Sequence, residues 1–299
     1  MKIAASVCVS MVVLGMGADS WAETVLETLS LKPGGMIEVS NVAGMVEVQA
    51  WSESKVEVKG DLGENQELSI DQTASGVRLE VVNRGDEDDF EDAELALKVP
   101  ESARLVIEVV SADVTVSGLM SESIVVEAVS GDIEIAAQTR RLEISSVSGD
   151  LKFNGASDRA VLETVSGDII AQKVKTEVSI RTVSGDATFT GAALERARAE
   201  TVSGDFTLDM GLTSGGRLVA EALSGDITLN LPSAQTGEFR LQTFSGDIRS
   251  EFGPKQESRG GPGSSLRHQE GEGDALIRVE SFSGDIEITK RYISSAGDS

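Results

Sequence analysis

The sequence predicts an all-β protein, a single-chain parallel β-solenoid with coils of 18 to 21 residues. Two observations predict this fold class. The tripeptide Ser-Gly-Asp occurs eight times, and successive copies begin 18, 18, 18, 19, 21, 21 and 38 positions apart. Apolar and polar residues alternate on both sides of each copy, which indicates short strands with one buried face. Repeats of this length are typical of elongated proteins in which each unit packs on its neighbours.

Residues 1–22 have the features of a signal peptide. Lys2 supplies a positive charge, an apolar run follows, and small residues lead to Ala22, after which we expect cleavage. The apolar run is shorter than the roughly 20 residues that cross a bilayer. The only cysteine, Cys8, lies inside it, so the mature chain has no thiol chemistry. We therefore expect an exported protein without a transmembrane segment after cleavage, located in the periplasm, with the cell surface or secretion as alternatives.

Residues 23–104 lack the tripeptide but keep the alternation of apolar and polar residues. We expect an N-terminal β region here that caps the solenoid, because an uncovered sheet edge invites pairing with other chains. The acidic run at 86–92 is too highly charged to pack and predicts a solvated loop.

Residues 105–292 form the predicted repeat region. Glycine takes positive φ without a steric penalty, and Ser and Asp bond nearby backbone groups, so each tripeptide predicts a tight corner. Right-handed winding is expected, as for other parallel crossovers. The predicted structural corners are Ser130, Gly131, Ser148, Gly149, Ser166, Gly167, Ser184, Gly185, Ser203, Gly204, Ser224, Gly225, Ser245, Gly246, Ser283 and Gly284.

Small residues two positions before each corner indicate a tight inside bend. They are Ala128, Ser146, Thr164, Thr182, Thr201, Ala222, Thr243 and Ser281. The last two corners are separated by the Gly-rich segment 253–274, which predicts a flexible insertion in about two coil periods. Residues 293–299 predict a disordered tail.

The aspartates of the repeat predict a file of carboxylates about 4.8 Å apart, which repel one another by roughly 1 kcal/mol per neighbour at the dielectric of water. Our interpretation is that each carboxylate accepts backbone N–H bonds at its own corner or the next. Calcium bound between neighbours is the alternative, although the glycine-rich nonapeptide of calcium-binding β-rolls is absent. The calcium candidates are Asp132, Asp150, Asp168, Asp186, Asp205, Asp226, Asp247 and Asp285.

The residue inventory argues against catalysis. His268 is the only histidine, so a Ser-His-Asp triad and a zinc site of His or Cys lack their ligands. Paired carboxylates could still cleave polysaccharides, as in enzymes built on β-helices. The aspartates belong to the repeat rather than interrupting it, however, and the mature chain has only Trp51 and Tyr292 besides its phenylalanines for stacking on sugars. The net charge of −24 disfavours nucleic acid as a partner.

The repeated Val-Ser-Gly-Asp coils, preceded by residues 37–51 and 99–103, resemble the bacterial "putative adhesin" family of β-strand repeat proteins, domain of unknown function 4097. The resemblance covers nearly all of the mature chain and implies an exported envelope protein. We therefore expect a non-enzymatic, adhesin-like scaffold without a cofactor that binds a protein or glycan of the cell envelope. A polysaccharide-active enzyme and a sensor of envelope stress are the alternatives.

Overall fold

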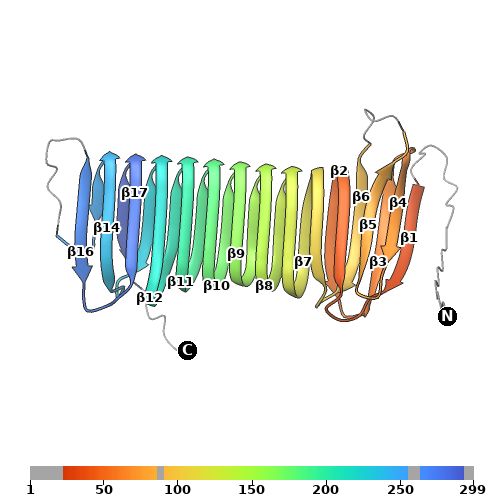
Figure 1. The fold of residues 1–299 in the computed structure, drawn as a ribbon, viewed down its shortest axis with the longest axis horizontal. Coiled ribbons are helices and arrows are strands. Elements are labelled where there is room, and N and C mark those ends of the chain that lie inside the picture. The colour runs from red at the N-terminus through yellow and green to blue at the C-terminus, as the bar shows by residue number, and fades with distance from the viewer. Residues whose placement is uncertain (1–22, 86–90, 255–262, 293–299) are drawn as a thin grey trace, which may run out of the picture.

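The computed structural model describes residues 23–85, 91–254 and 263–292, and these form one long rod of stacked β-coils. Figure 1 shows the coils side by side along the longest axis of the molecule. Neighbouring coils pair in parallel and in register, so that Ile133 lies beside Leu151 and Leu151 beside Ile169. The predicted all-β parallel solenoid is confirmed. The predicted signal peptide, the tail 293–299 and most of the acidic loop lie outside the described residues.

Each central coil is one strand ribbon that runs down one side of the rod, bends, and returns on the other side to the Ser-Gly-Asp corner. In β8 (Ile133–Ser148) the alternation of buried and exposed residues shifts near Arg140, where the ribbon bends. The five sequential coils are β8, β9 (Leu151–Ser166), β10 (Ile169–Ser184), β11 (Ala187–Ser203) and β12 (Phe206–Ser224), and they follow β7 (Arg104–Ser130).

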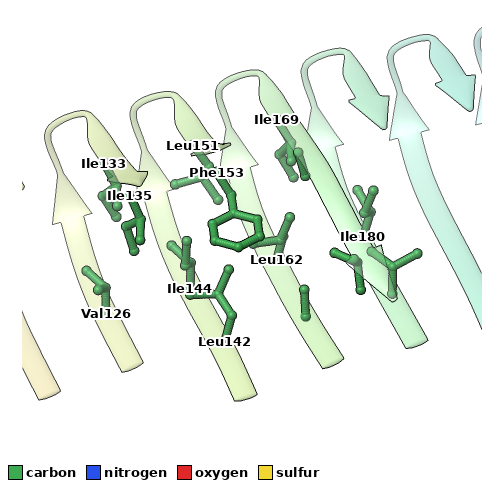
Figure 2. Packing of buried hydrophobic residues seen from close by; sticks show 14 of the residues in the cluster. Val126, Ile133, Ile135, Leu142, Ile144, Leu151, Phe153, Leu162, Ile169 and Ile180 are labelled. Carbon is green, nitrogen blue, oxygen red and sulfur yellow. The ribbon is translucent and has the colours of Figure 1, made fainter. Parts of the chain in front are cut away.

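The core is a stack of apolar layers between the two sides of the coils. Figure 2 shows Ile133 and Ile135 facing Leu142 and Ile144, with Phe153 in the next layer. Full burial of each such side chain contributes about 1.5–3 kcal/mol. The small residues before the corners are all buried, with exposed fractions of 1–8%, which confirms the inside bend.

The C-terminal coils are not stacked in chain order. Strands β17 (Leu276–Ser283) and β18 (Ile286–Arg291) lie between earlier strands: β17 pairs with β12 and with β14 (Gly237–Ser245), and β18 pairs with β13 (Ile227–Pro232) and with β15 (Ile248–Ser250). Figure 1 shows β17 between β12 and β14. The corner at Ser283 therefore lies between those at Ser224 and Ser245. Our expectation of a simple sequential stack is wrong at this end.

Part of the Gly-rich segment is also ordered, contrary to the predicted flexible insertion. Residues 264–270 form β16 (Ser264–Glu270), which pairs antiparallel with the outer edge of β14. Residues 255–262 lie outside the described part of the chain. Strand β16 thus covers the outer edge of β14. The chain then returns to the inner edge of β14, where β17 pairs.

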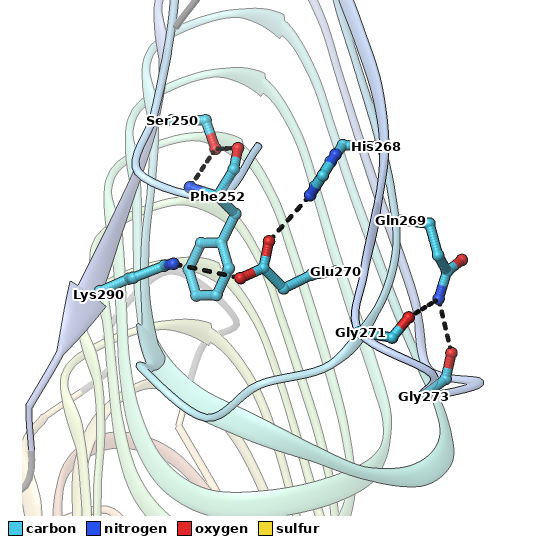
Figure 3. A network of polar contacts seen from close by, with 8 residues as sticks. All are labelled: Ser250, Phe252, His268, Gln269, Glu270, Gly271, Gly273 and Lys290. Carbon is cyan, nitrogen blue, oxygen red and sulfur yellow. Dashed lines mark hydrogen bonds and ion pairs between the residues drawn. The ribbon is translucent and has the colours of Figure 1, made fainter. Parts of the chain in front are cut away.

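The C-terminal end of the rod is closed by an aromatic and charged cluster (Figure 3). Phe252 is fully buried and stacks on Phe239 with a centroid distance of 4.8 Å. The Lys290 ammonium lies 4.5 Å from the Phe252 ring centroid and 3.3 Å from a Glu270 oxygen. The other Glu270 oxygen is 2.9 Å from His268 Nε2. The hydrogen bond from His268, assisted by Lys290, lowers the pKa of Glu270.

The N-terminal end is interleaved in a similar way. Strand β2 (Met36–Trp51) lies between β7 on one side and two later strands, β5 (Gly76–Asn83) and β6 (Ala93–Pro100), on the other. Three antiparallel strands complete this end: β4 (Gln66–Gln72) pairs with β5, β3 (Lys55–Leu62) with β6, and β1 (Glu23–Ser30) with β3. Residues 23–85, 91–254 and 263–292 contain no helix, and hence none that could span a membrane.

Candidate interaction surface at the corner edge

The Ser-Gly-Asp corners lie in a single file along one edge of the rod, which we call the corner edge. Every predicted corner glycine has positive φ, from 120° at Gly131 to 154° at Gly246. A Cβ on Gly167 would overlap the carbonyl oxygen of Gly149 in the preceding coil. Glycine is therefore required both for the turn and for the close approach of consecutive backbones.

The N-terminal coil carries one further corner that a search for the tripeptide misses. Gly44 has a φ of 108° and is the register partner of Ala112, which stands in Ser-Ala-Asp at 111–113, a copy of the tripeptide with Ala in place of Gly. It stands in the sequence Val-Ala-Gly-Met at 42–45, where Ala and Met replace Ser and Asp.

The aspartates of the corner edge form a continuous hydrogen-bonded ladder. The backbone N–H of Asp150 donates to Asp132 Oδ1 at 2.9 Å, and that of Asp168 to Asp150 Oδ1 at 2.8 Å. The ladder crosses the interleaved coil, because Asp285 donates to Asp226 and Asp247 donates to Asp285. Each carboxylate takes the place of a backbone carbonyl at the point where the corner interrupts the strand. Such charge-assisted bonds offset the repulsion between neighbouring carboxylates.

The structure brings all eight calcium candidates into this one file. One oxygen of each, Asp247 excepted, accepts the backbone bond from the next coil. Among the described residues, no group of three or more His, Cys, Asp or Glu side chains is arranged to hold a metal ion. Binding of calcium along the ladder, and the structural role of the corners, stay predictions.

Beside the ladder runs a column of exposed apolar side chains, which we call the apolar column. Its members directly precede the corner serine in each coil, and each is 42–55% exposed. Alternation along the strand directs the preceding small residue inward and this residue outward. In their order along the rod they are Val110, Val129, Val147, Val165, Val183, Val202, Leu223, Phe282 and Phe244.

The apolar column ends in an aromatic pair. Phe282 and Phe244 stack with a centroid distance of 4.9 Å and an interplanar angle of 8°, because β17 brings Phe282 next to β14. Nine side chains at about 4.8 Å per coil give a column about 38 Å long. A solvent-exposed apolar surface of this extent, with carboxylates along its border, is typical of interaction sites.

Ion pairs between coils flank the apolar column on the outward face of the same strands. Arg181 bridges Glu163 and Glu200 at 2.5 and 3.0 Å. The hydrogen bond from Arg198, together with that from Arg181, lowers the pKa of Glu200. These exposed pairs contribute little stability individually. They compensate part of the negative charge on the face beside the column.

A family model described as Toastrack DUF4097 matches residues 37–289, from the interleaved coil β2 to the interleaved strand β18. This chain belongs to the Toastrack family. The resemblance found in its Val-Ser-Gly-Asp coils is thereby confirmed. The match takes in the whole corner edge of this Toastrack protein, including the aspartate ladder and the apolar column.

Three solved structures with some similarity to this Toastrack chain carry names that refer to adhesion. A putative adhesin from Bacteroides fragilis is 11% identical, with 89% of this chain and 97% of that chain covered and a TM-score of 0.45. A putative adhesin from Parabacteroides merdae is 12% identical, with 89% and 96% covered and a TM-score of 0.44. A putative cell adhesion protein from Clostridium sporogenes is 12% identical, with 90% and 100% covered and a TM-score of 0.27. No curated protein matches the chain.

Proposed function

We propose that this protein is an exported, non-enzymatic scaffold of the cell envelope that binds a protein partner along its corner edge. The observation that carries the proposal is the apolar column, in which nine outward side chains from successive coils remain about half exposed. These side chains pack on one another from coil to coil but leave about half of their surface in water, and a continuous exposed apolar column of this length has the composition of a docking surface.

The aspartate ladder indicates the chemistry of the partner. It places a row of carboxylates directly beside the apolar column, on a chain with a net charge of −24. A partner segment with an apolar face bordered by Lys or Arg would complement both features. The names of the neighbours, which refer to adhesion, and the signal-like residues 1–22 agree with this role at the cell envelope.

The test compares binding of the purified mature chain to envelopes isolated from the producing bacterium. We expect Val147→Ser, Val165→Ser and Val183→Ser in combination to reduce retention at least tenfold, since each loses about 1 kcal/mol or more of apolar contact. The matched control replaces exposed apolar residues away from the column, Met120→Ser with Ile170→Ser, and should bind as the wild type does. Equal binding by the two variants would refute a role of the apolar column.

Export is tested separately. We expect fractionated cells to hold the protein outside the cytoplasm, with a mature N-terminus at Glu23 by mass spectrometry. An intact N-terminus in the cytoplasmic fraction would contradict this part of the proposal without affecting the binding test.

A further inference from the structure

An arginine-lined hollow lies at the bend of the coils opposite the corner edge. Its volume is about 590 Å³, and the four arginines that line it are Arg104, Arg140, Arg141 and Arg159. They come from β7, β8 and β9 and spread over four successive coils, because Ser123 of β7 lies in the coil between Arg104 and Arg141. Two acidic residues, Glu122 and Asp158, also line the hollow, so its lining carries a net charge of +2. This is a local excess of positive charge on a chain whose net charge is −24.

Two of these guanidinium groups have no protein partner among the described residues. Arg159 pairs with Glu177 at 2.9 Å, and Arg104 Nε donates to the Gly34 carbonyl oxygen at 3.1 Å. The guanidinium groups of Arg140 and Arg141 form no hydrogen bond or ion pair within the described part of the chain, although acidic residues outnumber basic ones by 50 to 26. Most other arginines of the described residues pair with a carboxylate, either across coils, as Arg181 does with Glu163, or within one strand, as Arg240 does with Glu238.

The register of the coils places like charges side by side in the hollow. Arg141 is the direct partner of Arg159 on one side and of Ser123 on the other. Neighbouring coils lie about 4.8 Å apart, where two cations repel by roughly 1 kcal/mol even at the dielectric of water. Glu177 neutralises Arg159 from the far side, so Arg141 and the adjacent Arg140 carry the uncompensated charge. A bound anion would remove the repulsion and satisfy the free N–H groups.

We propose that this hollow is a binding site for a phosphate group. A phosphate monoester carries a charge of about −1.5 to −2 near neutral pH and three acceptor oxygens. These can accept bonds from guanidinium forks on different coils at once, and the charge matches the net +2 of the lining. A carboxylate offers two oxygens and a single charge, so it satisfies one fork and leaves the other unpaired.

The site is independent of the proposed docking role, because its residues lie at the other bend of each coil. The phosphate could be free or part of a phosphorylated saccharide or headgroup of the envelope. Both sources present the same terminal oxygens, and an attached organic group fits because the hollow opens to solvent.

The experiment measures binding to the full mature chain by isothermal titration calorimetry at about 0.15 M salt, where long-range attraction is screened. The probes are inorganic phosphate, glycerol 1-phosphate and acetate. We expect both phosphates to bind and acetate to bind at least tenfold more weakly. Tighter binding of glycerol 1-phosphate would indicate an esterified ligand, and tighter binding of inorganic phosphate a free one.

The decisive variant is Arg140→Gln with Arg141→Gln, which should weaken phosphate binding at least about tenfold, the loss expected from one charge-assisted hydrogen bond. Arg141→Lys keeps the charge but loses the fork and should give an intermediate loss. The control is Arg217→Gln. Arg217 is an exposed arginine of β12 at the register position that Arg141 holds in β8, and it does not line the hollow, so this change should alter binding less than twofold. Absence of phosphate binding by the wild type, equal binding of acetate, or equal losses in variant and control would each overturn the proposal.

Discussion

Replacing one carboxylate of the aspartate ladder tests what the ladder contributes to stability. Asp168 is central: its N–H donates to Asp150 at 2.8 Å, and its Oδ1 accepts from Asp186 at 2.8 Å. Asp168→Ala removes one acceptor, while Asp168→Asn keeps an acceptor oxygen and removes only the charge. Both changes remove the repulsion from two neighbouring carboxylates, about 1 kcal/mol each in water.

The two substitutions should therefore differ by the hydrogen bond alone. A neutral hydrogen bond contributes about 0.5–1.5 kcal/mol, so we expect Asp168→Asn to be about 1 kcal/mol more stable than Asp168→Ala. Relief of repulsion should also make Asp168→Asn as stable as the wild type or slightly more stable at low salt. This advantage should shrink near 1 M salt, where the screening length is about 3 Å, while the difference between the variants persists.

Urea unfolding followed by circular dichroism at both salt concentrations measures these differences. Glu127→Gln and Glu127→Ala form the control pair, because the Glu127 carboxylate is exposed beside the apolar column and makes no hydrogen bond or ion pair with the described residues. Those two should agree within a few tenths of a kcal/mol. If Asp168→Ala proved as stable as Asp168→Asn, the ladder bond would have no stabilising role and the repetition of Asp would need another cause.

Four further expectations concern the core, the C-terminal end and cations. Thr182→Val should stabilise the fold by about 1 kcal/mol in urea unfolding, because the Thr182 hydroxyl is buried without a partner; destabilisation would reveal a bond. Glu270→Gln should flatten the loss of stability below about pH 4.5, since the lowered pKa of Glu270 gives stability that is present above its unfolded pKa and lost as pH falls through the folded pKa; an unchanged acid profile would contradict this. Deleting residues 276–299 should make residues 227–270 sensitive to protease, because β12 and β14 lose the strand between them; protection up to residue 275 would argue otherwise. Millimolar calcium should raise the melting temperature little, and a rise of about ten degrees would favour calcium bound along the ladder.

The sequence was sufficient to predict the solenoid because the signal is repeated in each coil. The spacing of Ser-Gly-Asp predicts the coil length, and the alternation around it predicts which residues face inward. The same alternation also predicts the apolar column, because the residue directly after the inward-facing small residue points outward and is apolar in each coil.

Other features required coordinates. A step of 38 residues fits two sequential periods as well as it fits an interleaved coil, because both bring each corner above another identical corner. Strand β16 lies in a Gly-rich segment whose composition predicts no packing, and its pairing with β14 is what reveals it. The arginine hollow depends on register between coils, which places Arg141 beside Arg159 although 17 residues separate them.

The interleaved ends have a consequence for how such rods vary in size. At each end of the rod one strand lies between strands from other parts of the chain: β2 at the N-terminal end and β17 at the C-terminal end. The coils from β8 to β12, in contrast, follow one another in chain order. Duplication or loss of one repeat in that middle stretch changes the span by about 4.8 Å and adds or removes one unit of the edge. Such a change leaves the interleaved strands at both ends unaltered, so the length of the rod can vary by whole repeats while its ends stay the same.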